Sequence, residues 1–143
     1  KMVIIPDKLY KYYLVNSTLT YKYRPNLYEV RKESVDIFKE FINKYKLDDN
    51  IIHYLYIKLL FADCMQMWEY KEKYSRTDRH LRIKALCLND EIINAKKNMK
   101  PQGVLQKVLY ITIKTNNITI IDSVARMLSY IRKKNPTIKR ASI

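Results

Sequence analysis

The chain contains one glycine, Gly103, among 143 residues. Tight β-hairpin turns usually need Gly or Asn-Gly, because their central residues adopt positive φ. A fold built from many short strands needs such turns repeatedly, so the scarcity of glycine argues against a β-sandwich or a β-barrel. Apolar residues make up 48% of the chain, which is enough to bury a core. We therefore expect one all-α domain, with helices joined by Asn- and Asp-based turns.

Apolar residues recur at helical spacing over residues 26–134, which predicts a bundle of about five helices. The first is expected over residues 27–46, where Asn26 and Glu29 resemble a capping box. The second begins near Ile51 and is apolar on nearly all sides, which is typical of a central helix; we expect it to continue to about Tyr74. Later helices are expected around residues 81–88, 92–95, 102–114 and 118–134.

Several segments are less regular. Residues 108–113 are β-branched and fit a strand, but their apolar stripe favours a helix. Residues 1–25 are rich in tyrosine and β-branched residues, which favours a short extended arm, interpreted as the end of an upstream catalytic domain. Residues 135–143 are expected to form a basic tail. Because the chain starts at Lys1 without a methionine, we expect it to be part of a longer protein.

The chain carries 28 Lys and Arg against 14 Asp and Glu, a net charge of +14. This surplus favours anionic partners: nucleic acid, an acidic membrane surface, a phosphate-bearing ligand or an acidic protein. Lysine-rich usage is also what an AT-rich genome produces. Cys64 and Cys87 lie among apolar residues, which fits buried thiols in a reducing compartment. With no leader and no membrane span in the sequence, we expect a cytoplasmic location, with association at the inner membrane face left open.

The residue patterns that carry catalysis are missing from the sequence. The histidines, His53 and His80, have no partner at zinc-ligand spacing. A single glycine allows neither a P-loop nor a dinucleotide fingerprint. On the expected second helix, His53 and Cys64 are eleven residues apart, about 16 Å along the axis. We therefore predict no catalytic residues, no metal and no cofactor in this chain.

One constellation fits ligand binding, since aromatic faces stack on sugars or bases and cations hold anionic groups. We predict contacts to an acceptor from Trp68, Tyr70, Lys71, Tyr74 and Arg76. The alternative is a solvated helix end with Trp68 in the core. A second basic face, which would suit an anionic membrane, consists of Lys107, Lys114, Arg126, Arg132, Lys133 and Lys134.

Short motifs along the chain resemble the C-terminal part of bacterial family-two glycosyltransferases of the GT-A type. In that family a strand with a Leu-Tyr-x-Tyr-like pattern and a Ser-Ile-Thr-like turn precede a charged helix and a tyrosine-rich helix. The matching segments are residues 5–12, 16–20, 38–45 and 54–60, followed by residues 88–91 and 107–110 before a basic-tipped last helix.

The resemblance implies a non-catalytic helical domain whose parent enzyme transfers a hexose from a nucleotide sugar. The chain has no Asp-x-Asp pair, which the resemblance places in the missing upstream domain. The implied partners are a glycan or glycoprotein acceptor of the surface-polysaccharide or serine-rich adhesin kind, the upstream catalytic domain and a second copy of the chain. The alternatives are a basic helical nucleic-acid-binding protein, supported by charge alone, and a membrane-surface docking module.

Overall fold

The computed structural model describes residues 23, 25 and 27–134. Within this part the chain forms α-helices and no strand, which confirms the predicted all-α class. Six α-helices are present, against the expected number of about five: α1 (Leu27–Lys44), α2 (Asn50–Glu69), α3 (Arg76–Cys87), α4 (Asp90–Asn98), α5 (Val104–Lys114) and α6 (Ile118–Lys134). A short 3-10 helix, η2 (Lys71–Lys73), joins α2 to α3. The expected arm, apart from Tyr23 and Pro25, and the basic tail lie outside the described residues.

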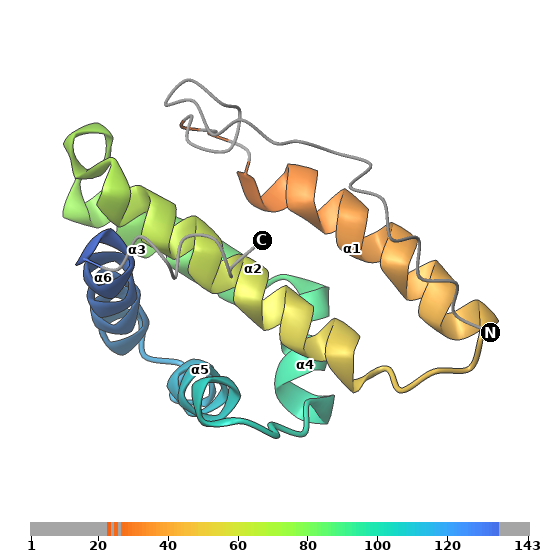
Figure 1. The fold of residues 1–143 in the computed structure, drawn as a ribbon. Coiled ribbons are helices and arrows are strands. Elements are labelled where there is room, and N and C mark those ends of the chain that lie inside the picture. The colour runs from red at the N-terminus through yellow and green to blue at the C-terminus, as the bar shows by residue number, and fades with distance from the viewer. Residues whose placement is uncertain (1–22, 24, 26, 135–143) are drawn as a thin grey trace, which may run out of the picture.

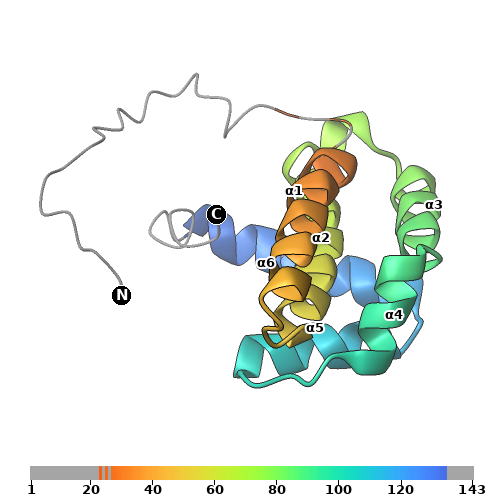
Figure 2. The same ribbon diagram turned by 90° about the vertical axis from the view of Figure 1, so that its right-hand side faces the viewer.

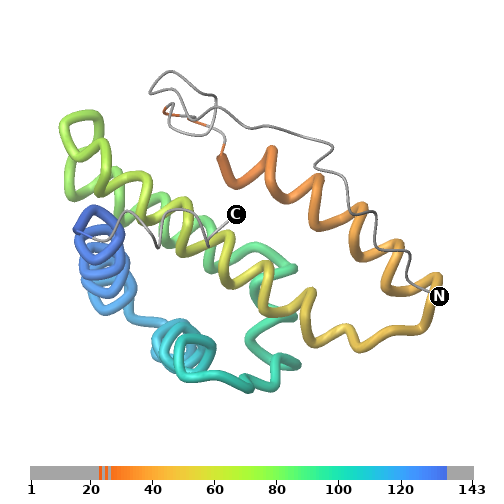
Figure 3. The backbone as a smooth tube through the Cα atoms, in the orientation of Figure 1, coloured from red at the N-terminus to blue at the C-terminus, as the bar shows by residue number. Residues whose placement is uncertain are grey.

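Helix α2 forms the centre of the fold, as its apolar sequence predicted, and packs against each of the other five α-helices. Figure 1 shows α1 on one side of α2 and α5 and α6 on the other, and Figure 3 follows the backbone through the same arrangement. Ile57, Leu60 and Cys64 of α2 are fully buried. The partner helices cover them with Ile83, Ile92, Ile113 and Ile121. Both cysteines are free thiols, and burial raises the pKa of Cys64 well above its ordinary value.

The predicted end of α2 is wrong, and α1 ends two residues before its predicted end, each for a local reason. Helix α2 stops at Glu69 instead of continuing to Tyr74. Beyond it, Lys71–Lys73 supplies no apolar side chain to pack on the core, so the helix loses its tertiary support. Helix α1 ends at Lys44, because Lys46 adopts a positive φ of 52° and the Leu47 amide turns back to the Ile42 carbonyl. The ambiguous segment 108–113 lies in α5.

Helix α1 is held to the bundle partly by polar contacts. Arg82 of α3 donates from Nε to Asp63 of α2 at 2.9 Å and from Nη2 to Glu29 of α1 at 2.8 Å. Lys32 of α1 pairs with Glu91 of α4 at 2.7 Å.

The α1 face toward the core carries Tyr28, Val35 and Ile42. Most of the apolar residues that marked this helix in the sequence instead lie exposed on its outer side: Val30, Ile37, Phe38, Phe41 and Tyr45.

No described helix has both the length and the apolar character needed to cross a bilayer.

Candidate functional site at the turn between α2 and α3

The turn between α2 and α3 is built by local signals that end one helix and begin the next. Ser75 is the N-cap of α3: its Oγ accepts from the Asp78 amide at 3.1 Å, and the Asp78 carboxylate accepts from the Ser75 amide at 3.0 Å. This capping box satisfies amide groups that the first helical turn leaves without partners. Hydrogen bonding to Ser75 holds the pKa of Asp78 below its usual value. The cap fixes the direction of α3 as it leaves the turn.

Tyr23, just before α1, contacts this turn. Its hydroxyl is 2.6 Å from that of Tyr74, and its ring centre is 5.2 Å from that of Tyr70 in an edge-to-face arrangement. The Lys73 ammonium lies 4.1 Å from the centre of the Tyr23 ring. Burial, then the bond to Tyr23, raises the pKa of Tyr74. The turn therefore holds the polypeptide that enters the helical domain.

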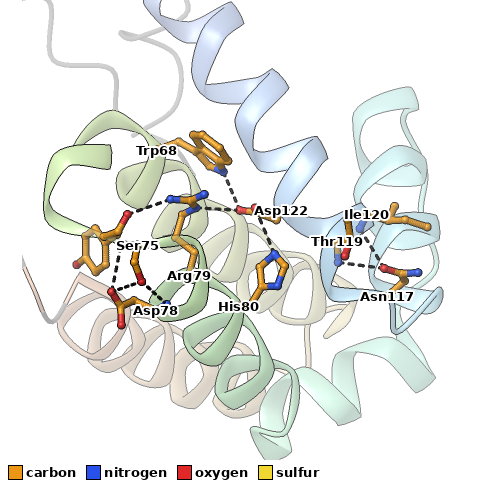
Figure 4. Close-up of polar contacts among 10 residues, drawn as sticks. Trp68, Ser75, Asp78, Arg79, His80, Asn117, Thr119, Ile120 and Asp122 are labelled. Atoms are coloured by element: carbon orange, nitrogen blue, oxygen red, sulfur yellow. Dashed lines mark hydrogen bonds and ion pairs between the residues drawn. The ribbon is translucent and has the colours of Figure 1, made fainter.

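Trp68, near the end of α2, is fixed by charged groups from two other helices (Figure 4). Its Nε1 donates to Asp122 of α6 at 2.8 Å. The Arg79 guanidinium carbon lies 4.0 Å from the centre of the Trp68 ring, and that of Arg126 lies 5.2 Å from it. Such cation–π contacts gain strength when the groups are shielded from water. Trp68 is thus a half-buried structural residue whose polar edge is already occupied.

Asp122 is a buried acceptor between helices. Besides Trp68, it faces Arg79, whose Nε is 3.5 Å from Oδ1, and His80, whose Nε2 is 3.6 Å from Oδ2. Both nitrogens are buried and make no hydrogen bond among the described residues. Arg79 uses another nitrogen, Nη1, to donate to the Tyr74 carbonyl at 3.0 Å. One carboxylate thereby orients an indole, a guanidinium and an imidazole.

An open groove of about 350 Å³ runs beside this cluster, between α3 and the start of α6. Arg76, His80 and Lys84 line it from α3, at successive positions four residues apart. Residues with this spacing lie above one another on one helix face, about 6 Å apart. Thr77, Leu81 and Ile118 complete the lining. The groove lining therefore combines two cations and an imidazole with the apolar side chains of Leu81 and Ile118.

The structure distributes the five predicted acceptor contacts over four surroundings. Trp68 packs on Asp122 and Arg79, while Tyr70 and Tyr74 contact Tyr23. Lys71 is exposed on η2. Arg76 alone lines the groove. Sequence reasoning missed Lys84 and Asp122; the spacing of Arg76, His80 and Lys84 was visible, but nothing in the sequence indicated that α6 would close the groove.

The charge pattern decides which chemistry the groove supports. Within the described part of the chain, no three His, Cys, Asp or Glu side chains come together as a metal site would require. Asp122, which faces the lining residue His80, also accepts from Trp68 and faces Arg79. Arg76 and Lys84 are exposed cations that can donate to an anionic ligand. The arrangement suits binding of an anion next to an apolar surface.

Comparison of the chain with protein-family models, with curated proteins and with solved structures gives no match. The resemblance to glycosyltransferases therefore stays a prediction from the sequence.

Proposed function

We propose that this chain is a non-catalytic helical module that binds an acidic glycan or glycoprotein acceptor, as part of a glycosyltransferase of the kind its sequence resembles. The observation that carries the proposal is the groove lined by Arg76, His80 and Lys84. A carboxylate on a sugar chain would pair with the cations, while the apolar face of the sugar would lie on Leu81 and Ile118. The net charge of +14 would draw such a ligand toward the chain.

Contact of Tyr23 with the turn supports a second part of the proposal. Residue 23 joins the helices to whatever precedes them, and it is anchored by Tyr70 and Tyr74. An upstream catalytic domain attached there would be held close to the residues that bind the acceptor. Deleting residues 26–134 from the parent enzyme is then expected to lower transfer to the acceptor and to spare nucleotide-sugar binding. Unchanged acceptor kinetics would contradict this part.

Binding of the 143-residue chain to immobilised oligosaccharides tests the groove directly. We expect retention on chains that contain uronic acids and none on neutral chains of the same length. Arg76→Ala/Lys84→Ala should lose this binding. Lys39→Ala/Lys133→Ala is the matched control, since it removes the same charge from exposed lysines outside the groove. If both double variants lose oligosaccharide binding equally, the binding is a non-specific attraction of charges. That result would contradict binding in the groove.

A DNA oligonucleotide in the same assay separates the nucleic-acid alternative. Binding to phosphate backbones falls steeply with added salt and depends on many cations rather than on two. If DNA is bound tightly and Arg76→Ala/Lys84→Ala changes that affinity no more than the control pair does, the nucleic-acid function replaces the one proposed here.

A further inference from the structure

One end of the molecule exposes apolar side chains from two connections that the fold brings together. The connection between α1 and α2 is tied to the connection between α4 and α5 by Asn50, whose side chain donates to the Lys100 carbonyl at 2.9 Å and accepts from the Lys100 amide at 2.7 Å. Both connections lie at the lower edge of the molecule in Figures 1 and 2. We name this surface, residues 44–51 and 97–107, the loop end.

The apolar side chains of the loop end are unusually open to solvent. Val104 is 82% exposed, and the exposed fractions of Leu47 and Leu105 are each 51%. Tyr45 and Ile51, also within the loop end, are 55% and 45% exposed. Exposed apolar side chains of this size are common singly, but a group of them at one end marks a contact surface.

The charged residues of the loop end indicate which kind of partner this surface contacts. Five lysines belong to the loop end: Lys44, Lys46, Lys97, Lys100 and Lys107. The acids there are Asp48 and Asp49. Asp48 accepts from the Asn50 amide at 3.0 Å, and Asp49 lies 3.8 Å from His53. Apolar side chains surrounded by lysines are what an interfacial segment presents to anionic lipid headgroups.

We propose that the loop end docks the protein onto an anionic membrane surface, with Leu47 and Val104 entering the headgroup layer and the lysines meeting lipid phosphates. Two members of the second basic face named from the sequence make contacts within the fold. Arg132 pairs with Glu69 at 3.6 Å, and Arg126 lies over Trp68. Only Lys107 of that set belongs to the loop end. The proposal goes beyond the glycan groove and shares no residue with it, so either can fail alone.

Flotation of the full chain with vesicles tests the docking. We expect the protein to float with vesicles of phosphatidylglycerol and phosphatidylcholine in equal parts, and not with phosphatidylcholine alone. Leu47→Ser/Val104→Ser should weaken binding to the mixed vesicles about tenfold, because the apolar area that enters the lipid is lost. Ile37→Ser/Leu88→Ser is the matched control, with side chains 69% and 65% exposed on α1 and after α3, and should bind as the wild type does.

A second flotation experiment tests the role of the lysines. It compares Lys44→Gln/Lys107→Gln, within the loop end, with Lys39→Gln/Lys133→Gln, which removes the same charge elsewhere. Only the first pair should weaken flotation. Unchanged flotation of Leu47→Ser/Val104→Ser, equal loss in its control, or equal binding to phosphatidylcholine alone would overturn the proposal. Light scattering without lipid adds one more outcome. A dimer that Leu47→Ser/Val104→Ser dissociates would make the loop end a contact between copies and would also overturn it.

Discussion

Tyr28 and Tyr56 are both buried, but their hydroxyl groups have different surroundings. Tyr56 donates to Asp36 at 2.5 Å, whereas the Tyr28 hydroxyl has no partner among the described residues. Burial raises the pKa of Tyr28 to about 12, and burial followed by the Asp36 bond raises that of Tyr56. A buried hydroxyl without a partner costs free energy, and one with a partner contributes to stability.

Replacing each tyrosine by phenylalanine should therefore have different effects. We expect Tyr56→Phe to lower the free energy of unfolding by about 1 to 2 kcal/mol, since Asp36 loses one of its two side-chain donors and keeps only Lys32. Tyr28→Phe should leave it unchanged or raise it by up to about 1 kcal/mol. Urea unfolding followed by circular dichroism measures both, and a larger loss for Tyr28→Phe would contradict the assigned contacts.

Asp122 supports three side chains at once, so its removal should be costly. Asp122→Ala removes the acceptor of the Trp68 indole and the carboxylate that faces Arg79 and His80. We expect the free energy of unfolding to fall by about 3 kcal/mol, the usual cost of a buried cation that loses its partner. Glu72→Ala, an exposed carboxylate on η2, is the control and should stay within about 0.5 kcal/mol of the wild type. A similar loss of unfolding free energy in Asp122→Ala and Glu72→Ala would show that the contacts of Asp122 do not stabilise the fold.

At the scale of elements, the attachment of α1 to α4 depends on ionised groups. Burial opposes ionisation of Glu91, but the hydrogen bond from Lys32, a backbone hydrogen bond and the charge of Lys32 together outweigh it, and the pKa of Glu91 is lowered. For Asp36, burial is likewise outweighed by bonds from Tyr56 and Lys32, so this pKa is lowered too. A carboxyl whose folded pKa is depressed stabilises the fold above its unfolded pKa. That contribution is lost as the pH falls through the folded pKa.

We therefore expect the free energy of unfolding to fall between about pH 6 and about pH 3. Asp63 acts in the opposite sense, because burial outweighs Arg82 and raises its pKa, so part of the fall is offset. Lys32→Met should flatten the profile, since it removes the donor that favours ionised Glu91 and Asp36. Urea unfolding at several pH values across this range measures the effect. Parallel plots of unfolding free energy against pH for Lys32→Met and the wild type would contradict the role assigned to Lys32.

The shortage of glycine affects how helices end. Lys46 and Asn116 are the described non-glycine residues with positive φ, each at 52°, and Gly103 does not have a positive φ. A lysine in this conformation is strained by its Cβ, whereas asparagine tolerates it better. Lys46→Gly should therefore stabilise the protein by up to about 1 kcal/mol, and Asn116→Gly by less. A thermal melt compares them, and destabilisation by Lys46→Gly would show that its side chain contributes more than the strain costs.

The same elements explain how far the sequence could predict the structure. The central position of α2 was predictable, because a helix apolar on all sides has to be covered. The inner face of α1 was not, because this helix carries two apolar stripes and only packing selects Tyr28 and Val35 over Ile37 and Phe41. For the site, Arg76 was named, but the groove depends on Ile118 of α6, which is brought to α3 by tertiary packing alone.

At the scale of the whole molecule, two proposed binding surfaces lie around one core. The core is centred on α2, the groove lies between α3 and α6, and the loop end is formed by the two connections tied by Asn50. Each surface uses exposed lysine or arginine side chains beside apolar ones. If both proposals hold, the net charge of +14 acts locally at these two surfaces and not only as a general attraction to anions.

The groove between α3 and α6 is the proposed ligand site, and chemical-shift mapping on the isotope-labelled chain tests this proposal residue by residue. On titration with an oligosaccharide that contains uronic acids, we expect amide chemical-shift changes centred on Arg76, His80, Lys84 and Ile118. The Trp68 indole signal should respond through Asp122. Changes spread evenly over all exposed lysines, or confined to residues outside the groove, would contradict the account.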